Sequence, residues 1–167
     1  MSELEIRPML RRDVRAVAAI ERSSFPEPWS ESLLRSELAQ GDTRRYRVAS
    51  RGRRIVGYLG LMFVEDQVHV NTIATDPSER QSGVASRLLL EGIDAAIARG
   101  GRRLTLEVAI SNEGAQRLYR RFGLAPVGVR KGYYRGEDAL VMWGEDLLSP
   151  PEVARRDQIA ASLGSFA

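Results

Sequence analysis

Apolar and polar residues alternate at the start of the chain and then change to a spacing of three or four. The alternation over Leu4–Pro8 predicts a short strand. The wider spacing predicts a helix over about 13–25, with an apolar face made of Val14, Val17, Ala18, Ile20 and Phe25. Pro26 and Pro28 then interrupt the chain, and Ser30 is a suitable N-cap for a second helix. The apolar residues of that helix are Leu33, Leu34 and Leu38.

The rest of the chain mixes strand-like runs with two further helical segments. The strand-like runs are 46–50, 55–64, 67–75, 104–110, 127–131 and 139–143. Helices are predicted over 84–99 and from a cap at Ser111 or Asn112 to Phe122. This order predicts an α/β fold: a mixed, mostly antiparallel sheet of six or seven strands, flanked by about four helices. The helix 84–99 would form a parallel crossover between two central strands.

Chain length and a late break suggest one domain with a tail. A chain of 167 residues fits a single domain, which we place at 1–148. Ser149-Pro150-Pro151 interrupts the pattern there, and the segment 149–167 follows as a C-terminal tail. Its apolar residues predict either a short amphipathic helix or a loose segment. They are Val153, Ile159 and Leu163.

Composition narrows the class of protein. The chain has no cysteine and one histidine, so we expect no disulfide and no metal site. It has no apolar run near the roughly 20 residues that span a membrane, and its acidic start lacks the features of a signal peptide. We therefore expect a cytoplasmic protein without a membrane partner. The net charge is only +3, and the arginines at 44–47 and 51–54 read better as a solvated hairpin than as a nucleic-acid site.

The segment 80–85, Arg-Gln-Ser-Gly-Val-Ala, follows a predicted strand and leads into a predicted helix. The first turn of a helix leaves backbone N–H groups without partners, and the helix dipole adds positive potential there. Gly83 permits a tight turn, Ala85 leaves the backbone accessible, and Arg80 adds a cation. This pattern is typical of a pyrophosphate-binding loop, although short glycine turns before helices are also common.

Three polar side chains in the predicted sheet and helices could take part in chemistry. Glu107 interrupts the apolar face opposite Leu104 and Leu106, so it must either pair with an arginine or face a cleft as a general base. Tyr119 lies at the edge of an apolar helical stripe and is either core or a proton donor. His69, opposite the neighbouring valines, is more often a hydrogen-bonded structural residue. The apolar stripe beside Tyr119 is Ala115, Leu118 and Phe122.

These segments together resemble the GNAT superfamily of acetyl-CoA-dependent N-acetyltransferases, and more narrowly its ribosomal-protein-alanine (RimI) type. The resemblance covers about 4–147 in order. It rests on the runs 71–77 (NTIATDP), 80–85 (RQSGVA), 106–108 (LEV), 111–113 (SNE) and 118–123 (LYRRFG), on 25–30 (FPEPWS), and on Tyr133-Tyr134 with 137–140 (EDAL). It implies the GNAT fold, in which two central parallel strands splay apart. Ala109 departs from that subfamily, where an arginine often follows the Glu-Val pair.

The resemblance also implies roles for individual residues. Glu107 matches the general base of the family and Tyr119 its general acid. The backbone of the strand would bind the pantetheine arm of acetyl-CoA, the loop would cradle its phosphates, and Asn112 would lie near the thioester. The cofactor-binding residues would be Ile73, Ala74, Thr75, Arg80, Gln81, Ser82, Gly83, Val84, Ala85, Ser86, Asn112 and Tyr119.

The resemblance identifies the acceptor-binding residues less specifically than the cofactor-binding residues. Trp29, Tyr133 and Tyr134 correspond to the family's acceptor groove, with His69 and Asn71 beside it; Trp29 could equally plug the space between the first two helices. The expected acceptor is a protein N-terminal α-amine, with a small-subunit ribosomal protein as a candidate. A small amine, a lysine side chain, or a non-catalytic acyl-CoA-binding module are alternatives. We expect a monomer or a weak dimer.

Overall fold

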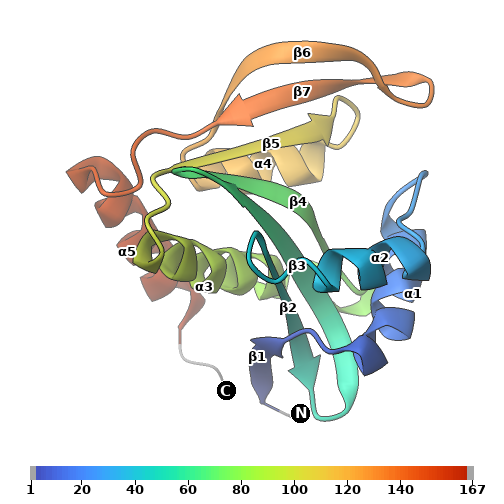
Figure 1. The fold of residues 1–167 in the computed structure, drawn as a ribbon. Coiled ribbons are helices and arrows are strands. Elements are labelled where there is room, and N and C mark those ends of the chain that lie inside the picture. The colour runs from blue at the N-terminus through green and yellow to red at the C-terminus, as the bar shows by residue number, and fades with distance from the viewer. Residues whose placement is uncertain (1–2, 165–167) are drawn as a thin grey trace.

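The computed structural model describes residues 3–164, which form a seven-stranded sheet between two layers of helices (Figure 1). The strand order is β1-β2-β3-β4-β5-β7-β6. The strands are β1 (Leu4–Pro8), β2 (Arg44–Arg51), β3 (Arg54–Val64), β4 (Gln67–Thr75), β5 (Arg103–Ala109), β6 (Ala125–Tyr134) and β7 (Glu137–Trp143). The helices are α1 (Val14–Ser24), α2 (Glu31–Leu38), α3 (Val84–Ala98), α4 (Glu113–Arg121) and α5 (Pro150–Leu163), with short 3-10 turns at Arg11–Asp13 and Pro77–Glu79.

The two central strands β4 and β5 pair over a short distance and then separate. All other neighbouring strands are antiparallel, whereas β4 and β5 are parallel and are connected through α3. Their register joins only Gln67, Val68 and His69 of β4 to β5. Beyond His69 the described residues show no pairing between them, so the sheet opens as the expected splay between two parallel strands.

A β-bulge in β4 lies just where this opening begins. Against β3, Val70 pairs with Leu61 and Thr72 pairs with Gly60, so Asn71 is an extra residue. A bulge shifts the alternation of side chains along a strand. Val70 and Ile73 consequently pack on one face of the sheet, although they are three residues apart.

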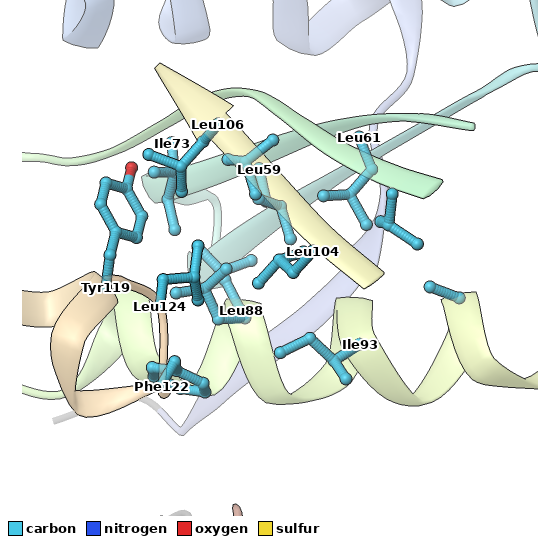
Figure 2. Packing of buried hydrophobic residues seen from close by; sticks show 14 of the residues in the cluster. Leu59, Leu61, Ile73, Leu88, Ile93, Leu104, Leu106, Tyr119, Phe122 and Leu124 are labelled. Atoms are coloured by element: carbon cyan, nitrogen blue, oxygen red, sulfur yellow. The ribbon is translucent and has the colours of Figure 1, made fainter. Parts of the chain in front are cut away.

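The two faces of the sheet have separate hydrophobic cores. Helices α3, α4 and α5 cover one face, where Leu88 and Ile93 pack with leucines of β3 and β5 (Figure 2). Helices α1 and α2 cover the other face, around Val17, Leu34 and Tyr58 (Figure 1). Apolar area removed from water contributes about 25 cal/mol per Å², so these two layers fix where the strands splay.

The sequence patterns predicted the elements well and the helix faces less well. Ser30 and Asn112 are the N-caps of α2 and α4, accepting hydrogen bonds from Leu33 N and Ala115 N. The predicted face of α2 is partly wrong, because Leu33 is 42% exposed while Glu37 is buried. In α4 the buried side chains are Gln116 and Tyr119, so Tyr119 belongs to the core rather than to the edge of the stripe.

The tail contains the fifth helix. Helix α5 packs on α3, with Ile159 buried in the core and the Arg156 guanidinium donating to the carbonyl of Leu147 at 2.7 Å. Of the two alternatives for the tail, the helix is found over Pro150–Leu163. Residues 165–167 lie outside the described part of the chain.

Candidate active site

A cavity of about 1170 Å³ occupies the opening between β4 and β5. Most of the side chains predicted for the site line it: Trp29, Asn71, Ile73, Ala74, Thr75, Arg80, Gln81, Ser82, Gly83, Val84, Ala85, Ser86, Glu107, Asn112, Tyr119 and Tyr134. His69 contacts Glu107 from behind the cavity wall, and the ring of Tyr133 meets Tyr134 edge-on. Residues from three strands (β4, β5 and β6), two helices (α3 and α4) and their connecting loops therefore converge here.

The loop before α3 has the backbone geometry of an anion site. Gln81 and Gly83 adopt left-handed conformations, with φ of 65° and 87°. Such turns direct successive N–H groups toward one side. The first backbone bond of α3 runs from Arg87 N to Gly83 O. The N–H groups of 84–86 therefore belong to the turn that lacks acceptors within the helix.

Glu107 lies at the inner end of the cavity and is nearly buried. Its side chain is 11% exposed. Oε2 lies 2.5 Å from Nε2 of His69, and Oε1 lies 3.4 Å from Nε of Arg130. The arginine pairing considered from the sequence is thus present, but Arg130 is 60% exposed and such pairs are weak. Glu107 both has an arginine neighbour and faces the cavity.

Tyr119, on α4, also lines the cavity. Figure 2 shows its side chain beside the buried residues of the core. The residue is 6% exposed. Burial, together with the nearby phenol of Tyr134, raises the pKa of the Tyr119 hydroxyl far above its usual value. A phenol in this state keeps its proton at neutral pH and can donate it.

The wider end of the cavity is aromatic and partly acidic. Trp29 packs against the α1–α2 core and also lines the cavity, while its contact with an acceptor stays a prediction. The pKa of Tyr134 is raised to about 12, by burial first and then by Tyr133 and Glu107. Glu27 accepts a hydrogen bond from the backbone of Arg135 at 2.7 Å and so connects the α1–α2 segment to the β6–β7 hairpin.

Two sets of lining residues were missed by the sequence patterns. Ser162 and Leu163, at the end of α5, line the cavity beside the loop before α3. Arg121 binds the Ser162 hydroxyl at 2.6 Å, and Arg87 binds the carbonyl of Leu163. The apolar spacing of the tail signals its helix, but a helix pattern does not indicate what that helix packs against.

The second missed feature is the buried carboxylate of Glu21, which is 1% exposed. It accepts hydrogen bonds from Tyr58 Oη and Thr72 Oγ1, both at 2.5 Å, and from the backbone of Trp29 at 3.1 Å. The spacing could have revealed it, because Glu21 lies seven residues after Val14 on the apolar face of α1. This carboxylate connects the end of the α1–α2 segment, at Trp29, to Tyr58 of β3 and Thr72 of β4.

Within 3–164, no three histidine, cysteine, aspartate or glutamate side chains gather as metal ligands would. No helix in that range combines the length and the apolar character that crossing a membrane requires.

Comparison with known proteins agrees with this geometry. Residues 14–124 match the Acetyltransferase (GNAT) family. A candidate ribosomal protein bS18-alanine N-acetyltransferase of Bacillus subtilis is 37% identical over 140 residues, which cover 83% of this chain and 93% of that protein. The N-alpha-acetyltransferase RimI of Mycobacterium tuberculosis is 36% identical over 142 residues, which cover 80% of this chain and 87% of that protein.

A solved structure agrees as well. The ribosomal-protein-S18-alanine N-acetyltransferase of Escherichia coli superposes with a TM-score of 0.77 at 29% identity. The superposition covers 84% of this chain and 92% of that one. The similarity therefore extends over most of both chains.

Proposed function

This chain belongs to the GNAT acetyltransferase family and is an acetyl-CoA-dependent N-acetyltransferase, and within that class we propose that its acceptor is the N-terminal α-amine of a protein. The observation that carries the proposal is the 37% identity to a ribosomal protein bS18-alanine acetyltransferase candidate over nearly the whole of that relative. The aromatic wall near Trp29 and Tyr134 supports it, because an extended peptide backbone packs well on such a surface.

The side chains supply a direct transfer between two bound substrates. An α-amine reaches the site mostly protonated, and Glu107 removes a proton from it. The amine nitrogen then attacks the thioester carbonyl, the N–C bond forms, and the C–S bond breaks. Tyr119 gives its proton to the departing CoA thiolate, and the second proton that the nitrogen loses as the amide forms restores the phenol. A backbone N–H near Ile73 would stabilise the oxyanion, and holding both substrates together supplies much of the rate.

The acceptor can be tested with matched peptides. We expect acetylation of peptides with a free N-terminal alanine, and none of the same peptides with a blocked N-terminus and an internal lysine. The first peptide to test is the N-terminus of the small-subunit ribosomal protein bS18, the acceptor that the relatives' names give. Mass spectrometry of the products locates the acetyl group. Equal modification of the blocked peptides, or of small amines alone, would contradict the proposal.

Gly83 gives a test of the cofactor loop. We expect Gly83→Ala to raise the KM for acetyl-CoA by about tenfold, because a Cβ in a left-handed residue costs roughly 1–2 kcal/mol. The added carbon would also lie 2.9 Å from Leu163 Cδ2. Steady-state kinetics with acetyl-CoA as the varied substrate measure the change.

Gly100→Ala is the matched control for that variant. Gly100 also has a positive φ, of 99°, but its Cβ would meet nothing within 4 Å and it lies at the far end of α3. The Gly100→Ala variant introduces the same kind of backbone strain at a position outside the cofactor loop. Equal KM values in the two variants would remove Gly83 from cofactor binding.

A further inference from the structure

A chain of hydrogen bonds leads from α2 to the candidate base. Glu37 Oε1 accepts from Asn71 Nδ2 at 3.1 Å, Asn71 Oδ1 lies 2.6 Å from His69 Nδ1, and His69 Nε2 lies 2.5 Å from Glu107 Oε2. The four residues come from α2, β4 and β5. The bulge at Asn71 lies within this chain, at the point where the two strands part.

Glu37 decides which way the Asn71 amide points. Glu37 is 6% exposed and accepts from Arg44 Nε through both oxygens, at 3.0 and 3.1 Å, and from the Tyr46 hydroxyl at 2.7 Å. A carboxylate held by an arginine only accepts hydrogen bonds. The amide nitrogen of Asn71 must therefore face Glu37, and its oxygen must face His69.

The orientation of Asn71 in turn decides the hydrogen on His69. An amide oxygen only accepts, so Nδ1 of His69 must carry a hydrogen. A neutral ring with that hydrogen has a lone pair on Nε2, which faces another acceptor in Glu107. These two atoms lie 2.5 Å apart, so a proton that reaches either of them can be held between both. The proton-free pair therefore offers one shared acceptor site.

We propose that Glu37 and Asn71 are positioning residues, which keep a hydrogen on Nδ1 of His69 so that Nε2 and Glu107 jointly hold the proton taken from the acceptor amine. This inference rests on the proposed function for the source of the proton. An N–H bond of the ammonium breaks, and the proton ends between Oε2 and Nε2. Without the asparagine, a neutral His69 would place its own hydrogen on Nε2, and Glu107 alone would be the base.

Other charged and titratable groups surround this pair, and the test must account for them. Arg130, from β6, lies 3.4 Å from the other oxygen of Glu107. Tyr134 donates to the backbone carbonyl of Glu107 at 3.4 Å, and the ring of Tyr133 meets that of Tyr134. On the α2 side, Arg44 and Tyr46 bind Glu37. None of these groups contacts Nδ1 of His69. The presence of a hydrogen on Nδ1 is therefore a measure of the contact with Asn71.

The first experiment uses the unaltered chain without a histidine tag. His69 is the sole histidine of the sequence, so histidine-labelled protein gives one imidazole spectrum without assignment. Proton–nitrogen correlation NMR across about pH 5 to 9, the range in which a histidine changes charge, shows which nitrogen carries hydrogen. We expect Nδ1 to carry it throughout. A neutral ring with its hydrogen on Nε2 would overturn the inference.

The second experiment removes the amide oxygen. In Asn71→Leu we expect the neutral ring to move its hydrogen to Nε2. The plateau of kcat should fall about tenfold, and the acid limb of its pH profile should move down by about one pH unit, since a hydrogen bond to a charged group is lost. The KM for acetyl-CoA should not change. A lower kcat with an unshifted profile and an unchanged tautomer would mean that Asn71 is only structural.

Gln40→Ala is the matched control, and the two measurements separate two kinds of failure. Gln40 is exposed and donates to the other oxygen of Glu37 at 3.1 Å, so its loss leaves Asn71 in place. We expect a wild-type spectrum and profile. The NMR result needs no acceptor. A different acceptor amine would contradict the proposed function and leave the tautomer unaffected, whereas the wrong tautomer would overturn only the proton-holding pair.

Discussion

Replacing Glu107 by glutamine is expected to lower kcat by about 10²- to 10⁴-fold, the usual contribution of a positioned general base. Glutamine has the same shape and can still bond to His69, but it cannot take a proton. The KM for acetyl-CoA should change by less than about twofold, since the loss falls on the chemical step rather than on binding. Release of CoA thiol with a peptide acceptor measures turnover, and calorimetry measures cofactor binding.

Tyr119→Phe tests the other side of the transfer in the same assay. The phenol is protonated at neutral pH and lines the same cavity as the candidate base, so it is expected to act as the acid for the thiolate. Tyr133→Phe is the control, because Tyr133 is 48% exposed and lies outside the lining of the cavity.

Two outcomes would contradict these assignments. Turnover within a few-fold of wild type in Glu107→Gln would exclude Glu107 as the base. A Tyr133→Phe loss equal to that of Tyr119→Phe would exclude Tyr119 as the specific acid.

The largest effect on stability is expected at Glu21. Glu21→Ala removes the acceptor of three donors: the hydroxyls of Tyr58 and Thr72 and the backbone N–H of Trp29. The two hydroxyls lie 3.3 Å apart and one can donate to the other, so two donors are left without an acceptor. Buried unsatisfied donors cost about 1–3 kcal/mol each, so the free energy of unfolding should fall by about 3–5 kcal/mol. At about 2–4 °C per kcal/mol, the melting temperature should fall by roughly 6 to 20 °C.

Glu31→Ala is the comparison for this loss. Glu31 lies in α2 and pairs with Arg35, but both side chains are well exposed, at 40% and 44%. Exposed pairs four residues apart contribute only about 0.3–0.5 kcal/mol. Denaturant unfolding of both variants measures the difference. A loss below about 1 kcal/mol in Glu21→Ala would show that water replaces the carboxylate.

The strands and the central residues of the site could be predicted because their signals are local. Alternation in β5 set Glu107 apart from Leu104 and Leu106, and the helix start after Gly83 indicated an anion site. The hydrogen-bond partners of Glu21 and Glu37 could not be predicted in the same way. Each lies on an apolar helical face, but its donors come from strands far along the chain: Tyr58 is 37 residues from Glu21, and Asn71 is 34 from Glu37.

The bulge at Asn71 has the same origin. The amino-acid sequence of β4 does not distinguish a continuous strand from one with a bulge. The shift in pairing register is visible only against Gly60 and Leu61 of β3. The faces on which Thr72 and Ile73 lie therefore depend on a neighbouring strand. The prediction that His69 is hydrogen-bonded is confirmed, but its partners required the bulge to be known.

The separation of β4 from β5 also gives this sheet an edge in its interior. An unpaired strand edge exposes hydrogen-bonding groups that tend to recruit another extended chain. If the pantetheine arm lies along Ile73 and Thr75, as the family resemblance implies, the cofactor completes the sheet from within. Ligand that binds only the folded state at a hundredfold excess over Kd adds about 2.7 kcal/mol to the free energy of unfolding. The cellular supply of acetyl-CoA would then govern how long the enzyme lasts as well as how fast it works.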